Sequence, residues 1–286
     1  MPLAPEPHYP PAAWRLLLSP LADGAANMAI DEAILLAVAA RDAIPTLRFY
    51  GWTPPCLSLG YAQAAAEVDA GRLGQLGHGL VRRPTGGRAI LHTDELTYSV
   101  IAPMDEPRVR GGVVESYQQL SAGLLRGLGH LGLAVNADRM PAQAGDSTPK
   151  GPVCFEVPSN YEITVGGGGQ PRKLLGSAQV RKQGVVLQHG TLPLTGDLGR
   201  ICDVLVFASD DERRRVRARL HERATTVEEV IGRPVAWESA AAALARGFSE
   251  ALNLSLVEAP LSARELALAD RLRIEKYSTD EWNRRM

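Results

Sequence analysis

Alternation of hydrophobic and polar residues is clearest in the middle of the chain, where it predicts β-strands. Residues 173–181 and 185–192 are extended runs bounded by turn residues, and hydrophobic side chains alternate with polar ones over 161–165. The glycine run 166–169 is too short for an interdomain linker and is typical of a hairpin turn. We therefore expect three strands that pair as a meander.

Two more strands are expected before this meander. Residues 46–50 and 96–101 have the length and composition of strands, and Leu96, Tyr98 and Val100 share one face of the second. The middle of the protein is therefore predicted to be a sheet.

Hydrophobic positions three and four residues apart predict helices on either side of the sheet. Asn27 is expected to cap a helix that continues through Leu35, with Asp31 and Glu32 in its first turn, where the helix dipole favours acids. Helical spacing returns near 115–131, 211–221, 239–252 and 262–276. This order predicts an α+β fold with a mixed, mainly antiparallel sheet flanked by helices.

Composition narrows the class of partner. The 286 residues are 45% hydrophobic and 22% charged, which is ordinary for a globular protein and excludes a disordered or fibrous chain. With 31 Lys and Arg against 32 Asp and Glu, the net charge is -1, so no overall basic field attracts nucleic acid or an anionic membrane. We expect neither partner. No run reaches the length of a membrane helix and no signal peptide is recognisable, so a cytoplasmic protein is expected.

The three cysteines, Cys56, Cys154 and Cys202, are too few and too scattered for a disulfide framework or a zinc cluster, so no metal is expected. Cys56 and Cys202 have apolar neighbours and are expected in the core. Cys154 comes just after the long Pro- and Gly-bearing loop 141–152 and is a candidate nucleophile. A thiol needs a nearby cation to be reactive at neutral pH, and Lys173 is placed to supply one if the hairpin returns the chain alongside itself.

A second candidate segment begins with two arginines. Arg82 and Arg83 precede the pair Gly86 and Gly87, where a ligand can approach backbone N–H groups without hindrance from a Cβ atom, and His92 ends the segment. Anions or amide carbonyls suit such a pocket. The alternative is a surface turn with two solvated arginines. A Walker loop is excluded, because no Gly-Lys-Ser or Gly-Lys-Thr follows.

The third candidate segment is the strand 173–181. Its polar face is expected to carry Lys173, Ser177, Gln179 and Arg181, and its apolar face Leu174, Ala178 and Val180. The polar face is suited to line a pocket, although an ordinary half-exposed strand has the same pattern. His92 and His189 are assigned no catalytic role, because a histidine beside a strand is more often structural. The arginine-rich helix near 211–221 is either a solvated face or a contact for an acidic carrier protein.

Four segments together resemble the biotin and lipoate protein ligase superfamily, in the order of its lipoate branch. They are Asn27–Ala33, Arg82–His92, Lys173–Gln179 and Leu187–Gly190, and the tail Lys276–Asn283 is also similar to lipoate ligases. The resemblance spans most of the chain. It implies a ligase-like catalytic domain over 1–250 and a short helical tail over 251–286.

Two chemistries occur in that branch, an ATP-dependent lipoate ligase and an octanoyltransferase that uses a cysteine thioester. The ligases usually have a third glycine and an acidic residue where this chain has Arg88 and Thr93. Many of these ligases also have a sizeable C-terminal accessory domain. In the present sequence we expect only a short helical tail after about Leu252. The segment 152–162, Pro-Val-Cys-Phe-Glu-Val-Pro-Ser-Asn-Tyr-Glu, resembles the cysteine segment of one octanoyltransferase group. The octanoyltransferase is therefore favoured.

The resemblance implies a mechanism and a site. Cys154 would take the octanoyl group from octanoyl-acyl carrier protein and pass it to one lysine of a lipoyl-domain protein, in this family the glycine cleavage H protein, with no cofactor. Lys173 corresponds to the family lysine that is implied to lower the thiol pKa, although about four extra residues separate the pair here. The implied substrate-binding residues are Arg83, Gly86, Gly87, His92, Gly176, Ser177, Ala178 and Gln179. An ATP-dependent ligase, or a relative that moves octanoyl between lipoyl proteins, remains the alternative.

Overall fold

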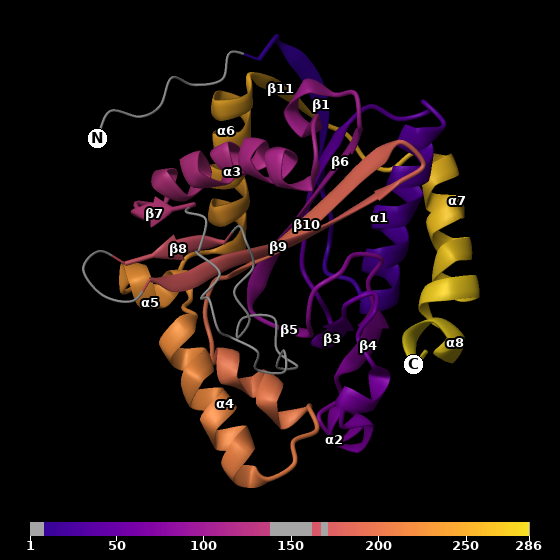
Figure 1. Cartoon of the computed structure of the whole chain (residues 1–286). Coiled ribbons are helices and arrows are strands. Elements are labelled where there is room, and N and C mark those ends of the chain that lie inside the picture. Colours follow the sequence, from indigo (N-terminus) through magenta and orange to yellow (C-terminus); the bar gives the residue numbers. More distant parts are fainter. Residues whose placement is uncertain (1–8, 138–161, 167–170, 286) are drawn as a thin grey trace.

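The protein is built around an eight-stranded mixed sheet, seen in a computed structural model that describes residues 9–137, 162–166 and 171–285 (Figure 1). The strand order is β11-β1-β2-β6-β10-β9-β8-β7. The strands are β1 (Ala12–Leu18), β2 (Thr46–Tyr50), β6 (Glu95–Pro103), β7 (Val135–Asn136), β8 (Ile163–Val165), β9 (Arg172–Lys182), β10 (Val185–Pro193) and β11 (Leu254–Glu258). β1 pairs in parallel with β11 and β2, and the other neighbours are antiparallel, so the predicted mixed, mainly antiparallel sheet is confirmed.

Helices cover both faces of this sheet (Figure 1). The pair α3 (Val113–His130) and α6 (Trp237–Leu252) packs on one face, and α1 (Gly24–Ala39) and α7 (Ala263–Leu272) lie on the other. The first pair can approach closely because Gly127 of α3 has no Cβ atom. A Cβ atom there would stand 2.7 Å from Leu244 Cα of α6, which is too close. The structure therefore confirms an α+β fold.

A smaller sheet lies beside the large one and has its own core. It has the order β4-β3-β5, made of β3 (Cys56–Leu59), β4 (Gly79–Arg82) and β5 (Ile90–His92). Leu57 and Leu59 pack against Val216 and Leu220 of α4 (Asp210–Arg223). The short helices α2 (Ala70–Gln75), α5 (Val227–Ile231) and α8 (Asp280–Asn283) complete the α-helices of the described residues. None of these helices is both long enough and apolar enough to cross a membrane.

The predicted start of the first helix is wrong by one turn. Asp23 is the N-cap, and its carboxylate accepts a hydrogen bond from the Ala26 N–H. Asn27 lies inside the helix, where its side-chain amide donates to the carbonyls of Ala22 and Gly51. Asp31 therefore does not lie in the first turn but in the buried middle of the helix. An acid there can persist only with a partner, which Arg48 supplies at 2.8 Å.

The strands of the central meander are confirmed where they are described. β9 and β10 include the predicted runs, and β2 matches 46–50 residue for residue. Tyr161 and glycines 167–169 of the proposed hairpin lie outside the described residues. The C-terminal segment contains β11 in addition to helices, and α7 packs on α1. The division into a domain over 1–250 and a tail over 251–286 stays a prediction.

Candidate active site

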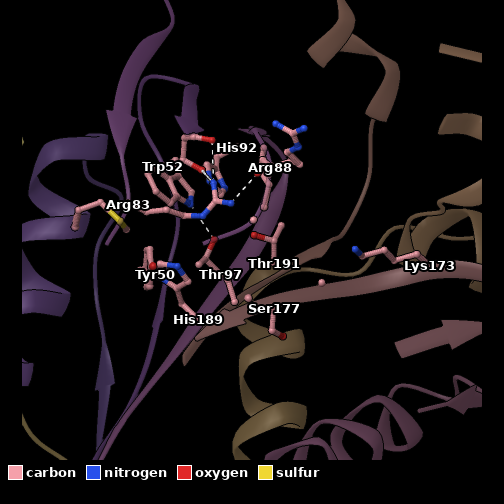
Figure 2. A pocket seen from close by; sticks show the side chains of 17 residues that line it. Tyr50, Trp52, Arg83, Arg88, His92, Thr97, Lys173, Ser177, His189 and Thr191 are labelled. Carbon is pink, nitrogen blue, oxygen red and sulfur yellow. Dashed lines mark hydrogen bonds between the residues drawn. The ribbon is translucent and has the colours of Figure 1, made fainter. Parts of the chain in front are cut away.

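A cavity of about 130 Å³ lies between the two sheets (Figure 2). An apolar protein cavity of about this size holds a benzene-sized molecule, so there is room for part of a hydrocarbon chain. Its walls come from α1, from β2 and the residues that follow it, from β3, β5, β6, β9 and β10, and from the loop after β4. The lining side chains include Met28, Tyr50, Trp52, Ser58, Arg83, Arg88, Ile90, His92, Thr97, Lys173, Ser177, Ala178, His189 and Thr191, together with Gly87, Gly176 and Gly190.

Arg83 folds the loop that follows β4 into a closed structure. Its guanidinium donates to the Ser58 carbonyl at 3.0 Å, to the Gly86 carbonyl at 3.0 Å and to the Arg88 carbonyl at 2.7 Å. Gly87 has a φ of 94°, which favours glycine. Both arginines of the motif are buried, so the alternative of a surface turn with solvated arginines is wrong.

A row of hydrogen bonds runs from Ser58 through His92 to Glu95. Ser58 Oγ lies 2.7 Å from His92 Nε2, and His92 Nδ1 contacts a Glu95 carboxylate oxygen. The same oxygen accepts from Thr97 Oγ1 at 2.7 Å. The indole of Trp52 stacks on the His92 ring with centroids 3.9 Å apart. Both histidine nitrogens are thus used, and the ring has a fixed orientation in the cavity wall (Figure 2).

His189 forms the opposite part of the wall. Its Nε2 lies 2.6 Å from Thr85 Oγ1, and Nδ1 is 3.5 Å from Asp31. Burial lowers the pKa of His189 despite the attraction of Asp31, which favours a neutral ring at physiological pH. Burial alone would raise the pKa of Asp31, but the adjacent Arg48 and His189 hold it below its usual range. A paired charge, Asp31 with Arg48, therefore lies behind the neutral imidazole of His189, outside the residues that line the cavity.

Lys173 lies on a different face of β9 from the one predicted. Thr164 pairs with Lys173 but Ile163 pairs with Leu175, so Leu174 is an extra residue in the strand. Such a β-bulge reverses the alternation of side chains. Lys173 therefore lies over Gly176, where a Cβ atom would stand 2.8 Å from Lys173 Cε. Its ammonium forms a buried ion pair with Glu162 at 2.7 Å and lines the cavity.

The side chains of Ser177 and Gln179 point toward Tyr98 and Ser116 and not toward Lys173, although Ser177 still borders the cavity. Ser177 Oγ is 2.8 Å from the hydroxyl of Tyr98, and burial raises the pKa of Tyr98 to about 12. Gln179 donates to Ser116 Oγ at 2.7 Å and is absent from the cavity wall. The predicted common polar face of Lys173 with Ser177 and Gln179 is therefore wrong, because of the bulge.

The remaining predicted site residues are divided between the cavity and other places. Arg83, Gly87, His92, Gly176, Ser177 and Ala178 line the cavity with Lys173. Gly86 does not line it, but its carbonyl is bound by Arg83. Cys154 lies outside the described residues. Cys56 and Cys202 are buried in the core, as expected.

Several cavity residues were missed by the sequence analysis. Trp52, Ser58, Thr97 and Thr191 lie outside the motifs that drew attention, and only the fold brings them to the cavity. Glu162 could have been noticed in the sequence, because it is a carboxylate directly before a strand that the sheet buries. Within the described part of the chain, no three His, Cys, Asp or Glu side chains are grouped to hold a metal ion.

Comparison with known proteins identifies the family. The family model of the lipoyl protein ligase A/B catalytic domain matches residues 23–249. Octanoyltransferase LipM of Kyrpidia tusciae is 45% identical over 276 residues, which cover 95% of this chain and 98% of the relative. LipM of Bacillus subtilis is 39% identical over 274 residues, 94% of this chain and 97% of the relative. The chain belongs to the LipM octanoyltransferase family. It is an enzyme of the acyltransferase class, within the predicted superfamily.

Solved structures similar to this LipM-family chain are lipoate ligases. A bi-partite lipoate protein ligase of Thermoplasma acidophilum, from a structure that includes its E2 lipoyl domain, has a TM-score of 0.78 and 27% identity, with 96% of each chain covered. A lipoate-protein ligase A bound with ATP has a TM-score of 0.75 and 28% identity, and 96% of this chain and 98% of that chain are covered. This LipM-family chain therefore shares its architecture with lipoate ligases.

Proposed function

We propose that this protein transfers an octanoyl group from octanoyl-acyl carrier protein to one lysine of a lipoyl domain, such as the glycine cleavage H protein, in lipoate biosynthesis. The observation that carries the proposal is 45% identity to a LipM octanoyltransferase over 95% of the chain. A largely apolar cavity with a buried lysine in its wall supports it, since an acyl chain needs an apolar tunnel and its reactive end needs a polar group.

The first half-reaction uses Cys154. Its thiolate attacks the thioester carbonyl of the donor, a carbon–sulfur bond forms, and the phosphopantetheine thiolate leaves and takes a proton. The product is an octanoyl thioester on the enzyme. We assign Lys173 the role of a fixed cation that favours the thiolate form of Cys154. Support comes from the position of the Lys173 ammonium in the cavity wall and from the family resemblance.

The second half-reaction releases the acyl group to the acceptor. The ε-amine of the acceptor lysine attacks the enzyme thioester, an amide bond forms, and the cysteine leaves as thiolate while the attacking nitrogen loses a proton. Conversion of a thioester to an amide is favourable, so the proposed reaction uses no ATP and no cofactor. A cytoplasmic location is part of the proposal.

The cavity is proposed to hold part of the octanoyl chain. Arg83, Gly86 and Gly87 shape one wall through the closed loop, and His92 adds a ring held flat by Trp52. Gly176, Ser177 and Ala178 form the opposite wall on β9. Gln179 is proposed to support this strand from behind, through its hydrogen bonds to Ser116 and Gln188.

A reconstituted assay separates this function from its alternatives. Purified protein is mixed with a lipoyl domain and one of three donors: octanoyl-acyl carrier protein, free lipoate with ATP, or octanoylated H protein. Modification with the first donor alone is the expected result. The second candidate function is that of an ATP-dependent ligase, and the similarity to a ligase A bound with ATP supports it. Such a ligase would modify the domain and release pyrophosphate only with lipoate and ATP. Activity with octanoylated H protein alone would instead identify an amidotransferase.

A further inference from the structure

Glu162 and Lys173 form a buried ion pair that none of the roles above explains. The carboxylate and the ammonium are 2.7 Å apart, and their side chains are 5% and 3% exposed. Removing two charges from water is costly, and a buried pair often contributes no more stability than an apolar pair of the same size. A buried pair with one member, Lys173, in the wall of a cavity is therefore more informative about chemistry than about stability.

Three features of the backbone set the position of the Lys173 side chain. The bulge at Leu174 turns the side chain of Lys173 toward Gly176, whose missing Cβ leaves the space for it. The Lys173 carbonyl accepts a hydrogen bond from the Thr225 N–H at 3.0 Å, at the junction of α4 and α5. The Lys173 ammonium is thus held at a set position over the cavity, with Glu162 as its carboxylate partner on the neighbouring strand segment.

The other charged side chains that line the cavity are basic, and carboxylates stand behind them: Glu67 pairs with Arg88, Glu95 with His92 and Asp31 with His189. Arg83 and Arg88 line the cavity from the loop after β4, and His92 and His189 line it from β5 and β10. Arg172, which precedes Lys173 on β9, forms an ion pair at the protein surface with Glu229 of α5 at 3.0 Å. Burial and neighbouring positive charges both favour the neutral form of an amine. The negative charge of Glu162 opposes both effects, because it favours the protonated form of the Lys173 amine.

We propose that Glu162 is a positioning residue of the acyl-transfer site, whose carboxylate keeps the Lys173 side chain protonated and directed into the cavity. The inference rests on the proposed function in one respect, that the Lys173 cation acts on the reacting cysteine. The proposed effect of Glu162 on the reaction is indirect, through Lys173. Glu162 acts by holding the charge of Lys173 constant over the working pH range.

The test is a titration of Lys173 in the full-length protein. The chain has only four lysines, Lys150, Lys173, Lys182 and Lys276, so the side-chain nitrogens can be followed by NMR of protein labelled with ¹⁵N-lysine and assigned with Lys173→Arg. In Glu162→Gln we expect the pH at which Lys173 loses its proton to fall by about one unit or more relative to wild type. The alkaline limit of octanoyl transfer should fall by the same interval, so that part of the lost activity returns at lower pH.

Two further variants complete the design. Arg172 is on the same strand as Lys173, and Glu229→Gln removes its exposed carboxylate partner on α5. This variant should leave unchanged both the titration of Lys173 and the pH dependence of octanoyl transfer. Glu162→Asp keeps the charge, so it should retain the wild-type titration of Lys173 even if Glu162→Gln folds poorly. An unchanged Lys173 titration in Glu162→Gln, or a lowered one in Glu162→Asp, would overturn the inference. Neither result bears on the cysteine mechanism, which fails separately if Cys154→Ala remains active.

Discussion

Arg82 and Asn283 are 201 positions apart in the chain and are joined by two hydrogen bonds. The Arg82 N–H donates to Asn283 Oδ1 at 2.8 Å, and its guanidinium donates to the Asn283 carbonyl at 3.0 Å. The same guanidinium binds the carbonyls of Gly60 and Arg285, and the residue is fully buried. The last turn of the chain is therefore part of the support beneath the loop that shapes the cavity.

Asn283→Ala should destabilise the protein through this contact. It removes the acceptor of the Arg82 N–H and the donor to the Tyr277 carbonyl, and leaves both groups buried without those partners. We expect a loss of about 2 kcal/mol in the free energy of unfolding, measured by urea denaturation. Arg284→Ala is the matched control, since the ion pair of Arg284 with Asp280 lies on the surface, and it should change stability by less than about 0.5 kcal/mol. Equal effects of the two variants would refute this account of the tail.

Gly176→Ala should impair acyl transfer without unfolding the protein. The new Cβ would stand 2.8 Å from Lys173 Cε and 3.1 Å from Nζ, so the flexible lysine must move. We expect acyl-enzyme formation to slow by about tenfold or more, with a stability change below about 1 kcal/mol. Gly74→Ala on α2, where a Cβ meets nothing within 4 Å, should keep the wild-type rate. A wild-type rate in Gly176→Ala would show that the position of Lys173 is unimportant.

Arg15→Met should make stability less dependent on acid pH. Arg15 binds Glu265 of α7 through both nitrogens, at 2.8 and 2.6 Å. Burial alone would raise the pKa of Glu265, but the hydrogen bonds from Arg15 and the Ser262 backbone hold it below its usual value of about 4.5. A carboxyl with a lowered pKa in the folded state contributes stability above its unfolded pKa and loses that contribution as the pH falls through its folded pKa.

The variant should therefore be about 3 kcal/mol less stable than wild type near pH 7. The difference between the two proteins should shrink as the pH falls below about 4.5, the ordinary value for Glu265, because the wild type loses the contribution of the pair there. Urea denaturation across this pH range measures the difference. A gap of constant size at all pH values would contradict the assignment.

The sequence predicted those parts of the fold that depend on local pattern. The strand 46–50 and the stripe of helix α3 follow from side-chain periodicity within one element. The face of Lys173 could not be predicted, because the bulge at Leu174 arises from pairing with β8 and not from the residues of β9. The pairing of Asp31 with Arg48 was missed for the same reason, since it joins a helix to a strand.

The site was predictable where short motifs fold on themselves. Arg83 and Gly87 lie in one continuous loop, and both line the cavity. Trp52 and Thr97 come from separate strands, and the hydrogen bond of 2.8 Å between them exists only after the sheet has formed. Sequence patterns therefore identified the loop that shapes the cavity but not the side chains that fold against it.

The most direct test of the account is intact mass spectrometry of the enzyme after mixing with octanoyl-acyl carrier protein alone. We predict that one octanoyl group is added per chain, that neutral hydroxylamine removes it, and that peptide mapping places it on Cys154. Cys56 and Cys202 are buried, and burial raises the pKa of Cys56, so neither should be modified. An octanoyl adduct that persists in Cys154→Ala, or transfer to the lipoyl domain by that variant at the wild-type rate, would contradict the central claim.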